Sequence, residues 1–267
     1  MEMAQLPRLV TSTSSLRRIP MSVADGDKVV LDGIRYSLEI ADSAYRRLRQ
    51  TLWEISQIPL PEHVEHYVDI VSDAWTIVDS LNRLREMCNA GCSYLERDYY
   101  RSYAETLQPV VMLRNANQHM RPRIEKIIAD KESAWGVISW FSLAANPPTH
   151  IDGHSLVAGS LRSLDIPMPD VPQHLFRMPV DAISMRAQKT EVSISQLMLA
   201  TIDFAEHLER DLSNLFPATA LHSRDAYARV TYKFTDTEIR APRVEVVITH
   251  ADPVSMNRAA RRKARKN

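Results

Sequence analysis

The sequence predicts a mainly α-helical protein, an antiparallel four-helix bundle with a small β insertion between the third and fourth helices. Three observations support this fold class. Apolar residues recur at helical spacing over long stretches. The chain has only six glycines and lacks the glycine-rich phosphate-binding runs of nucleotide-binding α/β folds. The helical spacing is lost between about 135 and 190, where aromatic and alternating residues appear.

The first helix is predicted over residues 27–56, where the apolar residues from Val30 to Ile55 lie on one face. The run Ile-Pro-Leu-Pro at 58–61 ends it, because proline cannot continue the hydrogen-bond ladder. The second helix is predicted over 62–90, with Gly91 closing it.

This second helix has two apolar stripes side by side. One stripe consists of Val64, Val68, Val71, Trp75, Val78 and Leu81, and the other of Ile70, Ile77 and Leu84. Two stripes indicate burial on two sides, by the bundle and by another subunit. The sequence therefore predicts that Ile70, Ile77 and Leu84 hold a homodimer.

The third helix is predicted over residues 98–131, with apolar residues in both halves and the polar run 114–118 between them. Pro122 lies inside this helix and removes the hydrogen bond to the carbonyl of Gln118. A kink is expected just after His119.

The β insertion begins with an alternating aromatic strand from Trp135 to Leu143. Asp152-Gly153 carries a hairpin-turn signal, and Val180 to Ala187 is a second predicted strand. The capping box Ser193-Ile194-Ser195-Gln196 begins a fourth helix that extends to about Phe216. A weak hairpin is expected from residues 226–234 and 243–250.

Four parts follow from this pattern. Residues 1–25 are expected to be a disordered lead and not a secretory signal, because they lack a continuous apolar core. The helical domain covers 26–216, with its β insertion at about 135–190. Residues 217–257 form a weakly β or irregular segment, and 258–267 form a basic tail.

The charge is balanced overall, with 33 basic and 33 acidic residues, but six positive charges are concentrated in the tail. They are Arg258, Arg261, Arg262, Lys263, Arg265 and Lys266. Such a tail either contacts nucleic acid weakly or only keeps the chain soluble. Cys88 and Cys92 are too few for a disulfide framework or a zinc site and are expected to be reduced. No stretch is long enough for a membrane span, and the cytoplasm is the expected location.

The strongest indication of chemistry is the run Arg114-Asn115-Ala116-Asn117-Gln118-His119. Arginine offers a permanent charge and a planar fork that fits phosphate, and histidine exchanges protons near neutral pH. Together they suffice to cut RNA without a metal. Five positions turn a helix through about 500°, so Arg114 and His119 point about 140° apart. Two copies meeting at a two-fold axis bring them together more easily.

This run on a predicted bundle helix resembles the signature of the HEPN (higher eukaryotes and prokaryotes nucleotide-binding) superfamily: an arginine, a polar residue, and a histidine after four to six residues. The polar segment 79–85 on the preceding helix is also similar to that family, and the resemblance covers about residues 27–131. It implies a homodimeric, metal-independent endoribonuclease, often a toxin or phage-defence effector with an antitoxin partner. Arg114 and His119 would be catalytic and Asn115 their polar helper, with no cofactor. The β insertion departs from the minimal bundle, and some HEPN-like proteins do not cut RNA.

Other interpretations stay open for the same residues. Arg114 would form an ion pair with Glu105, Asp79 or Asp73, and His119 would be a surface residue beside the kink. Arg121, Arg123 and Lys126 either extend a positive groove along an RNA backbone or form a solvated face. The protein would then be a non-catalytic helical interaction or nucleotide-binding module.

His150, Asp152 and His154 offer three candidate metal ligands but no fourth, and turn chemistry accounts better for Asp152 and Gly153. The aromatic residues Trp135, Trp140 and Phe141 are expected in the core, with a base-stacking platform as the alternative.

Overall fold

The computed structural model describes most of the chain, and it is mainly helical with a small antiparallel sheet. The described residues are 6–58, 64–95, 97–118, 121–144, 150–159, 179–216, 225–233 and 243–250. The helices are α1 (Asp25–Ser56), α2 (Val64–Ala90), α3 (Arg97–Thr106), α4 (Gln108–Gln118), α5 (Ile124–Asp130) and α6 (Ile194–Leu215). Two short 3-10 helices are η1 (Ser15–Arg17) and η2 (Arg121–Arg123).

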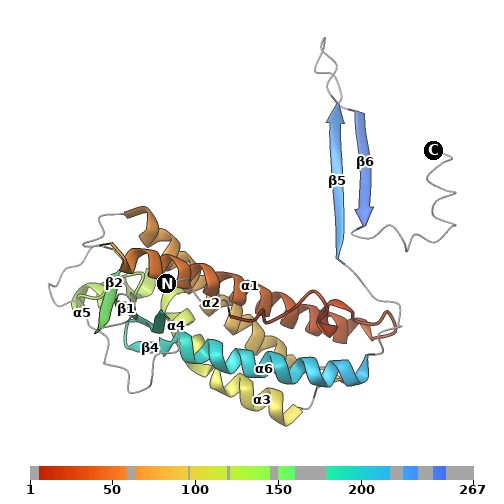
Figure 1. Cartoon of the computed structure of the whole chain (residues 1–267), viewed down its shortest axis with the longest axis horizontal. Coiled ribbons are helices and arrows are strands. Elements are labelled where there is room, and N and C mark those ends of the chain that lie inside the picture. The colour runs from red at the N-terminus through yellow and green to blue at the C-terminus, as the bar shows by residue number, and fades with distance from the viewer. Residues whose placement is uncertain are drawn as a thin grey trace.

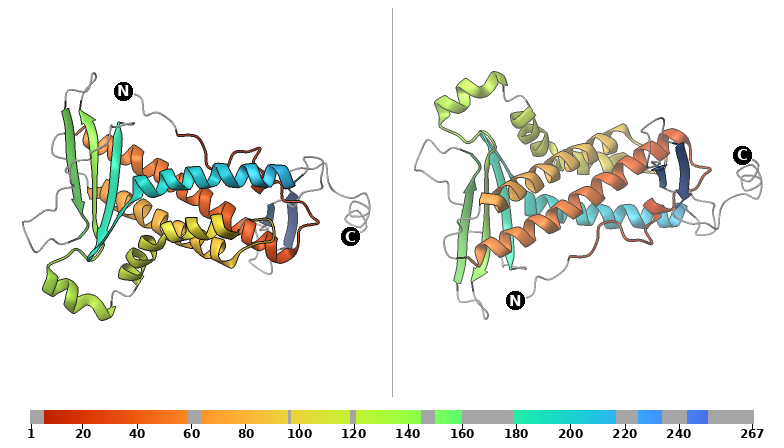
Figure 2. Two further views of the ribbon diagram at one scale, coloured as in Figure 1. Left: turned by 90° about the horizontal axis from the view of Figure 1, so that it is seen from below. Right: turned by 90° about the horizontal axis from the view of Figure 1, so that it is seen from above.

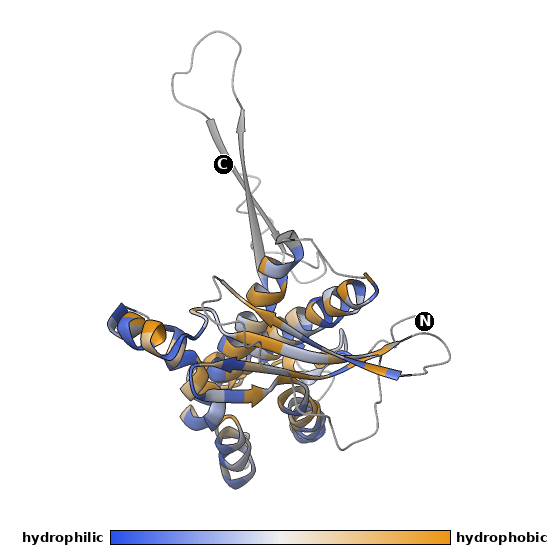
Figure 3. Ribbon diagram, turned by 90° about the vertical axis from the view of Figure 1, so that its left-hand side faces the viewer, coloured by the Kyte–Doolittle hydropathy of each residue, from blue (hydrophilic) through white to orange (hydrophobic). Residues whose placement is uncertain are grey.

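The long helices α1, α2 and α6 and the shorter α3 run side by side, and the sheet stands across one end of them (Figures 1 and 2). The helices carry both hydrophobic and hydrophilic residues, as the view from the sheet end shows (Figure 3). Their apolar faces meet in one core that also includes residues of the sheet. This arrangement confirms a mainly helical fold with a β insertion before the last long helix.

Helix α2 lies inside this assembly and contacts α1 on one side and α3 and α4 on the other. Its second apolar stripe is therefore interior, whereas the first stripe is buried at Trp75, Val78 and Leu81 but 67% exposed at Val68. Ile70, Ile77 and Leu84 are each 0% exposed, so the prediction that they form a dimer surface is wrong. The second stripe exists because a second layer of helices from the same chain covers it.

The predicted single helix over 98–131 is also wrong, because the chain breaks twice within it. The first break, at Leu107, separates α3 from α4. Pro109 has no N–H to donate to a carbonyl one turn earlier, so the helix restarts with Pro109 in its first turn. The second break comes after Gln118, where α4 ends, and the chain resumes in η2 at Arg121 around Pro122.

The sheet has the order β2-β1-β3-β4 with antiparallel neighbours. Its strands are β1 (Val137–Ala144), β2 (His150–Val157), β3 (Val180–Ala187) and β4 (Thr190–Ser193). The predicted strands at 135–143 and 180–187 are confirmed. The predicted turn at Asp152-Gly153 is wrong: both residues lie within β2, opposite Ser142 and Phe141. A Cβ added at Gly153 would lie 3.3 Å from the Phe141 ring, so a larger residue there would require the ring to shift slightly.

The capping box is confirmed at the start of α6, where the Ser193 side chain accepts a hydrogen bond from the Gln196 backbone N–H at 3.3 Å. The expected C-terminal hairpin also forms, from β5 (Ala226–Lys233) and β6 (Arg243–His250), and it stands away from the helices (Figure 1). Its root is tied to α1, because Arg35 donates to both carboxylate oxygens of Asp225 at 2.6 and 2.9 Å. This pairing lowers the pKa of Asp225 to about 2.

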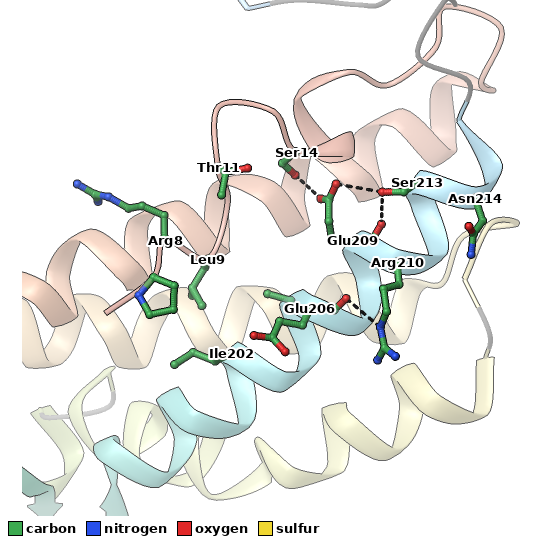
Figure 4. Close-up of a pocket in the computed structure, with 12 residues that line it drawn as sticks. Arg8, Leu9, Thr11, Ser14, Ile202, Glu206, Glu209, Arg210, Ser213 and Asn214 are labelled. Atoms are coloured by element: carbon green, nitrogen blue, oxygen red, sulfur yellow. Dashed lines mark hydrogen bonds between the residues drawn. The ribbon is translucent and has the colours of Figure 1, made fainter. Parts of the chain in front are cut away.

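Residues 6–24 pack along α1 and α6, which corrects the expectation of a disordered lead over 1–25 for this part of it. Val10, Leu16, Ile19 and Val23 are buried in the core. These residues show no helical or strand period, so the pattern gave no sign of their burial. Glu209 of α6 accepts a hydrogen bond from the Ser14 hydroxyl at 2.6 Å (Figure 4). It also accepts one from the Ser15 backbone N–H at 2.8 Å.

We expect Glu209→Ala to release this N-terminal segment, because the buried Ser15 N–H loses its acceptor. A hydrogen bond to a charged group contributes about 1.5–3 kcal/mol, so local opening should rise about 10- to 150-fold. Limited trypsin digestion at Arg17 and Arg18 measures it. Glu206→Ala, an exposed glutamate one turn earlier on α6, is the matched control. Equal digestion rates for the two variants would contradict the anchoring role of Glu209.

Candidate functional site

The described part of the polar run lies on α4, whose buried residues Leu113 and Ala116 hold it against the rest of the fold. The Arg114 side chain is 27% exposed, and Asn115 is exposed. His119 lies outside the described residues.

Arg114 forms an ion pair with Asp79 of α2: its Nε donates to the carboxylate Oδ1 at 2.9 Å. Asp79 is one of the three acids that the sequence offered as partners. The Asp79 side chain is 51% exposed, so the pair lies at the surface and solvent screens it. The Nε of the guanidinium faces Asp79, and its other N–H groups complete a planar fork with five donors in all.

A groove of about 800 Å³ opens beside this ion pair, between α2, the end of α4 and the edge of the sheet. Asp79 and Asn117 contribute to its lining. The aromatic and aliphatic part of the lining comes from Tyr67, Val68, Val71, Trp75, Trp135, Leu156 and Val157. Concave, mostly apolar sites of this size with a few polar groups are the usual form of small-ligand pockets.

The two tryptophans of the groove have different environments. Trp75 is 8% exposed and its indole N–H donates to the backbone oxygen of Trp135 at 3.2 Å. Trp135 itself is 48% exposed. The hydrogen bond fixes the backbone of Trp135 while its ring remains accessible, which corrects the expectation that Trp135 is a core residue. Trp140 and Phe141 are buried in β1 as expected.

Three cations were proposed to extend an RNA-binding surface, and they follow the groove residue Asn117 in the sequence: Arg121, Arg123 and Lys126. Arg121 on η2 and Lys126 on α5 are exposed, while the side chain of Arg123 lies outside the described residues. Helix α5 has no buried residues and projects beside the sheet (Figure 2). Both a solvated face and an RNA contact require exposed side chains, and Arg121 and Lys126 are exposed.

The histidines of β2 do not converge on one point. His154 stacks on Trp140 with ring centroids 5.0 Å apart, and its Nε2 lies 2.8 Å from the Ser142 hydroxyl. Burial lowers the pKa of His154 below its usual range. The Nε2 of His150, at the exposed end of the strand, lies 3.7 Å from the Oδ1 of Asp152. Within the described ranges, no group of three histidine, cysteine or acidic side chains is placed to hold a metal ion.

Sequence reasoning did not single out Tyr67 or Asn117 as site residues. One signal was present: Tyr67, Val71, Trp75 and Asp79 recur every four residues on α2, so they share one face. The other wall of the groove comes from Trp135 and the end of β2, which are distant in sequence. Only the fold shows that they face α2.

Comparison with protein families finds no family model that matches this chain. Searches among curated proteins and among solved structures likewise find no match. Among the helices that the structure describes, none is both long enough and apolar enough to cross a membrane.

Proposed function

We propose that this chain is a HEPN-like, metal-independent RNA endonuclease, with α1, α2, the α3–α4 pair and α6 as its four-helix bundle. The observation that carries the proposal is the position of Arg114: it is bonded to Asp79, whose carboxylate lines an open groove with aromatic walls. Single-stranded RNA is recognised by such combinations of stacking surfaces and polar edges. A strand bound in the groove would have its phosphates next to Arg114.

In the proposed reaction, His119 removes the proton of a ribose 2′-hydroxyl, and the 2′-oxygen attacks the adjacent phosphorus. The bond from phosphorus to the 5′-oxygen breaks, and the leaving oxygen takes up a proton from a protonated histidine. Arg114 stabilises the negative charge that develops on the phosphate, and Asn115 positions the strand. The products are a 2′,3′-cyclic phosphate and a 5′-hydroxyl, with no oxidation or reduction.

The proposal includes a homodimer. In this homodimer His119 of one copy meets Arg114 of the other, the shared site that the HEPN resemblance implies. A cytoplasmic toxin or phage-defence effector, held inactive by an antitoxin protein, is the biological setting that the HEPN resemblance implies.

A second candidate is a non-catalytic HEPN-like module that binds a nucleotide or another partner in the same groove. The Arg114–Asp79 ion pair favours it, because the carboxylate already neutralises part of the charge that a phosphate would need. In this case the groove would bind its ligand with the ion pair intact.

RNA cleavage by the purified full chain is expected to persist in EDTA and to leave cyclic phosphate or 3′-phosphate ends, since neither proposed catalytic group needs a metal. The measurement is incubation of single-stranded RNA with and without EDTA, followed by analysis of the ends. Cleavage that requires Mg²⁺ and leaves 3′-hydroxyl ends would contradict the mechanism. Binding without cleavage in either condition would favour the second candidate.

A further inference from the structure

Two polar side chains of the groove lining have a definite hydrogen-bonding character. Asp79 contributes a carboxylate, which only accepts hydrogen bonds, and its two oxygens offer about four acceptor positions. The Nε of Arg114 occupies one of them, on Oδ1. Asn117 contributes a carboxamide, which both donates and accepts. A ligand edge that contacts both side chains therefore presents N–H groups to Asp79 and an acceptor to Asn117.

The apolar part of the groove fits a flat aromatic group. Trp135 has an accessible ring and a backbone fixed by Trp75, and Tyr67 lines the same groove. An exposed indole in a concave site is suited to stack on a base. The groove thus combines a stacking surface with a carboxylate and a carboxamide.

We infer that this groove binds a guanine base. Guanine has two adjacent donors on one edge, N1–H and the exocyclic N2 amino group, which match the two oxygens of one carboxylate. Its O6 lies beside them and accepts from an amide N–H such as that of Asn117. Adenine and cytosine each place an acceptor next to their amino group, and uracil places its single N–H between two carbonyls, so none of them presents two adjacent donors to Asp79.

The inference rests on the proposed function only for the source of the base, a single-stranded RNA. Guanine bound in the groove would place its own or the neighbouring phosphate near Arg114. The groove would then determine which nucleotide lies next to the proposed cut.

Binding is measured by calorimetry on the full chain in EDTA, with short 2′-O-methyl oligoribonucleotides that cannot be cut by attack of a 2′-hydroxyl. One oligonucleotide is uridine-only, and the others carry a single guanine, adenine or cytosine in the same position. The guanine oligonucleotide is expected to bind at least about 10-fold more tightly than the other three, as two hydrogen bonds to a charged group require. Equal affinities for all four, or no binding, would overturn the inference.

Variants of Trp135 and Asp79 test whether the guanine binds in this groove. Trp135→Ala should weaken binding of the guanine oligonucleotide about 5- to 150-fold, the effect of losing one stacking contact. Its matched control is Ile151→Ala, because Ile151 on β2 is equally exposed at 48% but does not line the groove. An effect of Ile151→Ala as large as that of Trp135→Ala would place the binding elsewhere.

Asp79→Asn should remove the preference for guanine, because a carboxamide cannot accept from two adjacent donors. Asp73→Asn is its control: Asp73 is on the same helix as Asp79, is ion-paired with Arg47 of α1 and does not line the groove. Retention of the guanine preference in Asp79→Asn would overturn the inference. Guanine binding by a chain that cuts no RNA would support the inference and contradict the proposed function, whereas RNA cleavage without any guanine preference would do the reverse.

Discussion

Replacing His119 with alanine is expected to lower the rate of RNA cleavage about 10²- to 10⁴-fold, the usual contribution of a general acid or base. The mechanism gives His119 the only proton transfers, and neither Arg114 nor Asn115 can replace it. An arginine stays protonated at any working pH, and a carboxamide does not titrate near neutrality. The rate is measured on a fluorescent single-stranded RNA in EDTA, with thermal unfolding measured on the same sample.

Gln118→Ala is the matched control for that variant, because Gln118 is the exposed last residue of α4 and has no proposed catalytic role. It should cleave RNA within a few-fold of the parent rate. Unchanged cleavage by His119→Ala would show that the site assignment is wrong. An equal loss in both variants would show that the end of α4, and not the imidazole, controls the rate.

The sequence predicted the bounds of helices and strands closely where the spacing of apolar residues agrees with a local capping signal. The first helix was predicted over 27–56 and is α1, Asp25–Ser56; the predicted strand 180–187 is β3. The fourth helix begins at its predicted cap, Ser193. These elements depend on information within about 20 residues, namely which faces are apolar and which side chain satisfies the first N–H groups.

The third helix shows where local reasoning failed. The sequence predicts a kink at Pro122 and none at Pro109, although both prolines lack an N–H. The chain breaks near both of them. Leu107 lies at the first break and is 0% exposed. Because this apolar residue continues the buried stripe of α3 into α4, the apolar pattern shows no gap where the helix stops. Periodicity alone did not distinguish one bent segment from two helices.

Burial of charge was not predictable from the pattern either. Arg49 lies in the C-terminal half of α1 and is only 2% exposed, and its Nε and one terminal nitrogen have no hydrogen-bond partner among the described residues. Burial lowers the pKa of Arg49. On a helical projection Arg49 lies beside Tyr45 and Leu52, at the border of the apolar face, from which a long charged side chain is expected to reach solvent. The sheet packs against this half of α1 in three dimensions, as the hydrogen bond from Trp140 to Ser56 shows, and no local rule gives that contact.

The candidate site was predicted only in part. Asp79 was one of three acids proposed for Arg114, and the structure selects it. The groove itself was not predicted, because its walls join residues about 60 positions apart, as Trp75 and Trp135 are. The N–H of Trp75 and the oxygen of Trp135 meet only after β1 and β2 have packed at the end of the helices. Sites of this kind depend on non-local contacts that a single sequence does not specify.

Phe204→Ala is expected to have the largest effect on stability. Phe204 is 0% exposed, stacks on Tyr103 with ring centroids 4.0 Å apart, and meets the edge of Tyr100 at 5.5 Å. It therefore joins α6 to α3. Removing a buried phenylalanine ring costs about 3–5 kcal/mol through lost burial and the cavity left behind, and aromatic pairing adds to this.

For a domain of this size, that loss lowers the melting temperature by about 6–20 °C. Thermal unfolding followed by circular dichroism measures it. Leu199→Ala is the matched control, because Leu199 is on the same helix but 42% exposed, and its cost should stay within about 0.5 kcal/mol. Phe204→Leu keeps most of the volume and should fall between the two, so the effect is measurable even when the alanine variant does not fold. A loss below about 1 kcal/mol in Phe204→Ala, against the 3–5 kcal/mol expected, would mean that α6 is not held to α3 by this aromatic cluster.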